Sequence, residues 1–154
     1  WQTARLTAPG LSITAAQGTW SATLLSGPAD RIAALAKPFP QARLLPIAPD
    51  RALLVGPPND LPDGWHPKGV AVSDLSHAHI RIDVTGPGTL LLLQRGSPSL
   101  ALNPSPTGAA TAFAGVTVLI DPMPDGIRLY VDRPAAPHIW HWLSTVLTAP
   151  KDHP

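Results

Sequence analysis

The sequence contains no cysteine among its 154 residues. The absence of thiols excludes disulfide bonds, thiolate metal sites and cysteine nucleophiles. It also fits a reducing compartment, and we expect the protein to be cytoplasmic. Aliphatic runs such as those at residues 90–93 and 118–120 fall far short of the roughly 20 apolar residues that cross a bilayer. No basic stretch precedes a hydrophobic core near the first residue, so neither a secretory signal nor membrane association is expected.

Charged side chains are also scarce, at 14% of the residues against roughly 25% in ordinary soluble domains. Eleven basic residues oppose ten acidic ones. They form no basic stripe and no aromatic platform, which argues against nucleic-acid binding. A surface with few charges is easier to bury against another protein, because buried charges must be paired. A genome biased toward alanine and proline codons explains the same composition, and the sequence leaves both explanations open.

The most informative part of the chain begins with a polar turn at residues 74–77. Ile80, Ile82 and Val84 then alternate with polar residues, the period-two pattern of a strand with one solvated face. Gly86-Pro87 ends this strand, because proline cannot donate to a sheet but suits the first turn of a helix. The following residues, 89–95, include four consecutive leucines and are predicted to form that helix.

The first half of the chain has a similar plan. A strand at 19–25, with Trp20, Ala22 and Leu24 inward, leads to Gly27-Pro28 and a helix that ends before Pro38. Two strands follow the helix in each half. They are expected at 44–47 and 51–55 in the first half, and at 112–120 and 127–131 in the second. The Gly-Pro corners lie 86 − 27 = 59 positions apart. We therefore predict an α+β fold of two strand–helix–strand–strand units with mostly antiparallel sheet. A single domain is expected over 1–154, with an extended arm at 1–18 and a tail at 149–154.

An apolar stripe at helical spacing predicts a C-terminal helix, with polar residues on its opposite side. The stripe consists of Ile139, Trp142, Leu143, Val146 and Leu147, and the opposite side of His138, His141 and Thr145. Trp140 lies at the edge of the stripe, where it either anchors an interface or is covered by a loop of the chain itself. Loops as long as 56–64 and 97–108 usually contact something or are mobile. We predict Trp140, Trp65 and Leu100 as interface residues.

Asp74, Ser76 and His77 supply the residue types of a hydrolase triad. Residues so close in sequence rarely converge in the required geometry, and the chain has no Gly-x-Ser-x-Gly elbow. The alternative is that Asp74 and Ser76 cap the turn through backbone hydrogen bonds.

Two histidine pairs, His77 with His79 and His138 with His141, would suit zinc if they met. Neither pair has a carboxylate at metal-ligand spacing, and histidines on a solvated helix face explain the second pair. Gly86-Pro87-Gly88 lacks the third glycine of a dinucleotide fingerprint, because Leu91 stands there. We therefore assign no catalytic, cofactor-binding or metal-binding residue to the chain.

Several segments carry a family resemblance. Asp-Leu-Ser-His at 74–77, the strand, Thr-Gly-Pro at 85–87 and the leucine-rich helix resemble the start of the folate-binding fold of the glycine-cleavage T-protein. Arg-Gly-Ser-Pro at 95–98 resembles an Arg-Gly-Cys-Pro segment, with serine replacing the cysteine. Segments 114–119, 125–131 and 138–143 resemble the later strands and the closing helix. In order and spacing these segments are similar to gamma subunits of heterotetrameric sarcosine oxidases.

The resemblance implies a small non-catalytic subunit of a flavoenzyme that oxidatively demethylates sarcosine or a related N-methyl amine. It implies that large and flavin-bearing subunits bind FAD, FMN, NAD and tetrahydrofolate, and that this chain binds none of them. Its role would be to stabilise the large subunit. The alternative is a stand-alone module of the same fold that binds folate or another small molecule. A histidine-dependent metalloenzyme is a third possibility.

Overall fold

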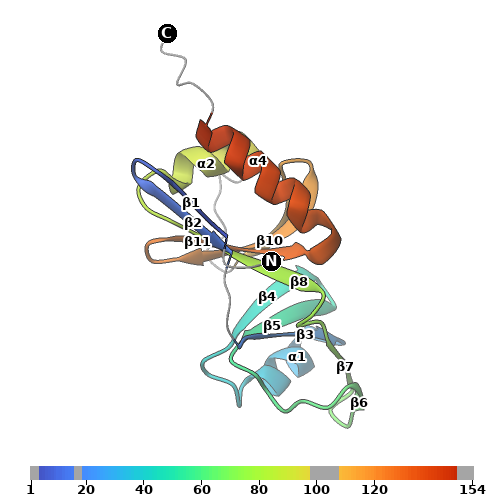
Figure 1. Ribbon diagram of the computed structural model, residues 1–154. Coiled ribbons are helices and arrows are strands. Elements are labelled where there is room, and N and C mark those ends of the chain that lie inside the picture. The colour runs from blue at the N-terminus through green and yellow to red at the C-terminus, as the bar shows by residue number, and fades with distance from the viewer. Residues whose placement is uncertain (1–3, 16–18, 98–107, 149–154) are drawn as a thin grey trace.

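The computed structural model describes residues 4–15, 19–97 and 108–148, and within them the chain forms two antiparallel sheets. Figure 1 shows helices on the outer side of each sheet. The six-stranded sheet has the order β1 (Arg5–Ala8), β2 (Leu11–Ala15), β8 (His79–Thr85), β11 (Gly126–Asp132), β10 (Val116–Met123) and β9 (Ala109–Phe113). The five-stranded sheet has the order β4 (Arg43–Ala48), β5 (Arg51–Gly56), β3 (Ser21–Ser26), β7 (Val70–Asp74) and β6 (Gly64–His66). The helices are α1 (Ala29–Ala36), α2 (Thr89–Gly96) and α4 (Ala136–Thr148), which follows a short 3-10 turn, η1 (Arg133–Ala135).

This architecture confirms the predicted α+β class and its two similar units. In the first unit, β3 leads through α1 to β4 and β5, and the spatial order is β4-β5-β3. In the second, β8 leads through α2 to β10 and β11, in the equivalent order β10-β11-β8. Equivalent hydrogen bonds hold the two Gly-Pro corners. Gly27 N donates to Asp50 O at 2.9 Å, and Gly86 N donates to Asp125 O at 3.0 Å, in each case reaching the following hairpin turn.

Each sheet is extended by a hairpin that lies outside its own unit in sequence. The β1–β2 hairpin precedes the first unit but pairs with β8 of the second, whereas the β6–β7 hairpin precedes the second unit but pairs with β3 of the first. Gly86 shows how closely these parts approach. Its φ is +109°, and an added Cβ would lie 2.5 Å from Gly10 O in the β1–β2 turn. Only glycine fits this corner without strain.

Three apolar clusters fill the layers. Above the six-stranded sheet, Ile82, Val84 and Phe113 are buried with Ile139 and Leu143 of α4. Below the five-stranded sheet, Ile32 and Leu35 of α1 pack in a second cluster. Between the sheets lie Ala22, Leu45, Leu53, Val55, Leu119 and Tyr130, with Trp20 and Leu24 packed against them. The predicted inward direction of Trp20, Ala22 and Leu24 is therefore confirmed, and so is the apolar stripe of the C-terminal helix.

Two predictions about the strands are wrong. The expected strand at 112–120 is a hairpin of β9 and β10, because Ala114 and Gly115 turn the chain with φ values of +50° and +83°. The expected solvated face of β8 faces the second sheet. Its Arg81 and Asp83 side chains are only 22% and 29% exposed. Within the expected arm at 1–18, the described residues form β1 and β2. The predicted tail at 149–154 lies outside the described residues.

Candidate functional site

In the polar turn between β7 and β8, the serine side chain makes hydrogen bonds that hold the turn in place. Ser76 Oγ donates to Asp74 Oδ1 at 2.5 Å and accepts from Ala22 N at 3.1 Å. Ser76 N also donates to Asp74 Oδ1, at 2.9 Å. The hydrogen bond from the Ser76 hydroxyl is the main reason that the pKa of Asp74 is lowered. These contacts support a capped turn rather than a triad, because the hydroxyl is already engaged and its partners include no imidazole.

Two of the four histidines considered as metal ligands, His79 and His138, contact neighbouring oxygens. His79 Nδ1 lies 3.3 Å from Leu75 O, and His79 Nε2 lies 3.3 Å from Asp132 Oδ1. His138 Nε2 lies 2.8 Å from Ala114 O, at the turn between β9 and β10. Across 4–15, 19–97 and 108–148, no three His, Cys, Asp or Glu side chains gather closely enough to hold a metal ion.

The backbone N–H groups of the Gly86-Pro87-Gly88 corner also donate hydrogen bonds to other parts of the chain. Gly86 N donates to Asp125 O, and Gly88 N donates to Gly10 O at 2.9 Å. A phosphate cradle requires backbone N–H groups that point at the ligand. Both N–H groups of this corner are taken, so the geometry supports a structural corner.

A network of arginines and aspartates lies on the face of the six-stranded sheet that is turned toward the other sheet. Arg128 Nε donates to Asp83 Oδ1 at 2.7 Å, and Arg81 Nη2 lies 3.4 Å from Asp83 Oδ2. Asp121 stands opposite Arg128 in the β10–β11 register. Arg43, at the start of β4, completes the network from the second sheet, with Nη2 2.6 Å from Asp121 Oδ1. The network therefore joins the two sheets.

Asp121 is the unusual member, because its side chain is fully buried whereas that of Arg43 is 44% exposed. Burial raises the pKa of Asp121, and the positive charges of Arg43 and Arg128 partly oppose this rise. Neither carboxylate oxygen has a hydrogen bond of good geometry, so the short contact with Arg43 acts as an ion pair. The sequence shows these residues only as scattered single charges, and no pattern in it predicts their meeting.

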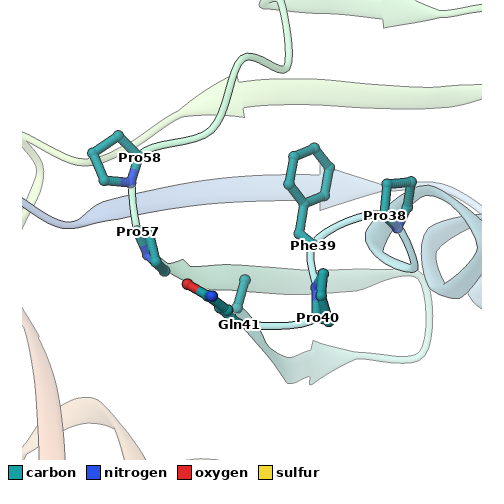
Figure 2. A pocket seen from close by; sticks show the side chains of 7 residues that line it. Pro38, Phe39, Pro40, Gln41, Pro57 and Pro58 are labelled. Carbon is teal, nitrogen blue, oxygen red and sulfur yellow. The ribbon is translucent and has the colours of Figure 1, made fainter.

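A notch of about 220 Å³ lies where the segment after α1 meets the segment after β5 (Figure 2). Its walls are Pro38, Phe39, Pro40, Gln41, Ala42, Pro57 and Pro58. Figure 2 shows the Gln41 amide pointing toward Pro57. Within residues 4–15, 19–97 and 108–148, this amide is the only polar side-chain group that lines the notch. The notch therefore offers apolar contact and one neutral hydrogen-bonding group, but no acid, base or nucleophile.

The predicted interface residues differ in exposure. Trp65 on β6 is 73% exposed. Trp140 is partly buried against the core beneath α4, and its carbonyl accepts a hydrogen bond from Ser144 Oγ at 2.8 Å. Leu100 lies outside the described residues. An interface role for all three stays a prediction.

The sequence reasoning missed two exposed leucines on α2. Leu90 is 54% exposed and Leu91 is 55% exposed, whereas the next two leucines of the run are buried. A signal was available in the run itself. A helix turns about 100° per residue, so four consecutive leucines cannot all face one core.

No protein-family model matches the sequence, and no curated protein matches it either. Among solved structures, a chain of the heterotetrameric sarcosine oxidase from Corynebacterium sp. U-96, in complex with pyrrole 2-carboxylate, is similar, with a TM-score of 0.69. The two chains share a fold. The match covers 92% of this chain and 88% of that chain, at 20% sequence identity. It therefore extends over both sheets and the C-terminal helix, not over one unit alone.

Among the described residues, no helix is both long and apolar enough to cross a membrane.

Proposed function

We propose that this chain is a small structural subunit of a cytoplasmic, heterotetrameric oxidoreductase of the sarcosine oxidase type. The enzyme would oxidatively demethylate sarcosine or a related N-methyl amine. Its large and flavin-bearing subunits would bind FAD, FMN, NAD and tetrahydrofolate. The observation that carries the proposal is the shared fold over 92% of this chain and 88% of a chain from a heterotetrameric sarcosine oxidase.

The side chains of the described residues support a structural role. The Ser76 hydroxyl, the His79 ring and the Arg–Asp network all make contacts that hold the turn or the sheets together. General acid–base or nucleophilic catalysis requires a reactive group within reach of a substrate. The notch of Figure 2 has no such group in its lining.

The exposed apolar side chains support a role within a complex. Trp65, Leu90 and Leu91 each leave more than half of their surface open. Exposed apolar surface of this kind is typical of protein contact sites.

The test is co-expression of the full chain with the sarcosine-oxidase-like large and flavin-bearing subunits encoded in the same genome. We expect one flavin-containing species in size-exclusion chromatography that includes this chain. We also expect a lower yield or stability of the large subunit when the chain is omitted, and no turnover of sarcosine by the chain alone. A chain that elutes apart from the other subunits would contradict the proposal.

The same preparation tests the alternative of a stand-alone module. Tetrahydrofolate is titrated into the purified chain and binding is followed by calorimetry. Saturable binding by the isolated chain would favour the module over the structural subunit.

A further inference from the structure

The two equivalent helices α1 and α2 expose different chemistry. Each has eight residues and follows a Gly-Pro corner. The second and third positions are Asp30 and Arg31 in α1, and both are exposed. The same positions in α2 are Leu90 and Leu91, which are 54% and 55% exposed. The equivalent exposed positions are thus charged in α1 and apolar in α2. Because exposed leucines are unfavourable in water, we infer that α2 is covered in the assembled protein.

An apolar groove of about 180 Å³ lies beside these leucines. It is formed where the β1–β2 turn, α2 and the end of α4 meet, which Figure 1 shows at one end of the molecule. Its lining includes Ala8 at the end of β1, Pro9 of the turn, Leu91 and Arg95 of α2, and Val146 and Leu147 of α4. Leu90 is not part of this lining, but it is exposed on the same helix, one residue before Leu91.

Among the described residues that line this groove, Arg95 is the only charged one. It is exposed, and no described residue forms an ion pair or hydrogen bond with it. No aspartate or glutamate is found in the part of the lining that the structure describes. A ligand that fills the groove therefore needs apolar side chains for the leucines and a carboxylate for Arg95.

We propose that this groove, together with the exposed Leu90 of the same helix, binds an apolar segment of the large partner subunit that presents an acidic residue to Arg95. The proposal rests on the proposed function and names the surface through which the chain would join its complex. A second copy of the chain is a poorer fit. In a twofold symmetric dimer the same patch faces itself, which would bring Arg95 near Arg95 with no acidic residue between them.

The test uses the full chain and the co-expressed large subunit, with two variants. Leu90→Asp/Leu91→Arg gives α2 the exposed pair that α1 carries at the equivalent positions. Arg95→Glu reverses the charge of a side chain that has no described partner, so it is not expected to disturb folding. The matched control is Ala33→Asp/Ala34→Arg, which places the same charges at exposed positions of α1.

We expect the leucine variant to weaken binding of the large subunit by roughly 10- to 100-fold, because about half the surface of two leucines would no longer be buried. Arg95→Glu is expected to weaken it about tenfold and to remove part of the salt dependence. The control is expected to bind like the wild type. Affinities are measured by biolayer interferometry at two salt concentrations, and circular dichroism verifies that each variant is folded.

The outcomes separate this inference from the function on which it rests. If the wild-type chain does not bind the large subunit, the proposed function fails and the groove proposal fails with it. If the wild-type chain binds and both variants bind equally well, only the groove proposal is overturned. It is also overturned if the isolated wild-type chain is a dimer that the leucine variant converts to a monomer, because a second copy then covers the groove.

Discussion

Arg43→Gln tests the ion pair that joins the two sheets. The change removes the charge 2.6 Å from Asp121 and leaves a fully buried carboxylate without its nearest cation. Loss of one partner of a buried pair costs about 3–5 kcal/mol of unfolding free energy. We expect about 3 kcal/mol, the lower end of that range. Arg43 is already 44% exposed, and the positive charge of Arg128 also acts on Asp121.

The pH dependence of this cost has a definite sign. Burial raises the pKa of Asp121, so the folded carboxyl holds its proton more tightly than the unfolded one. The folded state therefore gains stability as the pH falls through the interval between the raised pKa and the ordinary one. Removing Arg43 raises the pKa of Asp121 further, because Arg43 now lowers it. The stability deficit of Arg43→Gln should consequently shrink when the pH is lowered from neutral toward about 5.

The assay is urea unfolding of the purified chain, followed by tryptophan fluorescence at neutral and mildly acidic pH. Arg43→Gln/Asp121→Asn is the matched control, because it removes the buried charge together with its partner. We expect the double variant to recover most of the lost stability, with a coupling free energy of about 2 kcal/mol. A double variant no more stable than Arg43→Gln, or a deficit that is equal at both pH values, would refute the ion-pair reasoning.

Three further substitutions test the fold, each by urea or thermal unfolding. Ser76→Ala should cost about 1–2 kcal/mol, because the buried N–H of Ala22 loses its acceptor; an unchanged midpoint would show that water replaces the hydroxyl. Phe113→Ala should cost about 3–5 kcal/mol, since this ring is fully buried in the largest cluster, and a loss below 1 kcal/mol, judged against that range, would contradict its core position. Gly86→Ala should cost about 2–3 kcal/mol, because its φ of +109° is strained for alanine and its Cβ would meet Gly10 O; wild-type stability would mean that this corner relaxes easily.

Local signals predicted much of the fold. The alternation at Ile80, Ile82 and Val84 gave β8, and the stripe from Ile139 to Leu147 gave α4, because each element buries one face against a core. The Gly-Pro corners marked the start of both short helices. These features are encoded within one element and its ends, which is why periodicity and corner residues were sufficient to find them.

Features that depend on distant partners were not predicted. The β6–β7 hairpin is short, with β6 at the sheet edge, and its place next to β3 depends on pairing across the sheet rather than on its own pattern. The polar face of β8 is indistinguishable in sequence from a solvated one. It is partly buried because this face of the sheet is turned toward the second sheet. For α2, the run of four leucines indicates that some of them are exposed, but which ones are exposed depends on how the neighbouring elements pack.

The reciprocal exchange of hairpins has a consequence for how the chain can be divided. A cut in the segment between β5 and β6 would separate the two units, yet each fragment would carry an edge hairpin that belongs to the sheet of the other. Neither fragment could complete its hydrogen bonding unaided. The two fragments are therefore expected to stay associated after cleavage of the folded chain. If they are separated and unfolded, they are expected to regain native structure only when they are mixed.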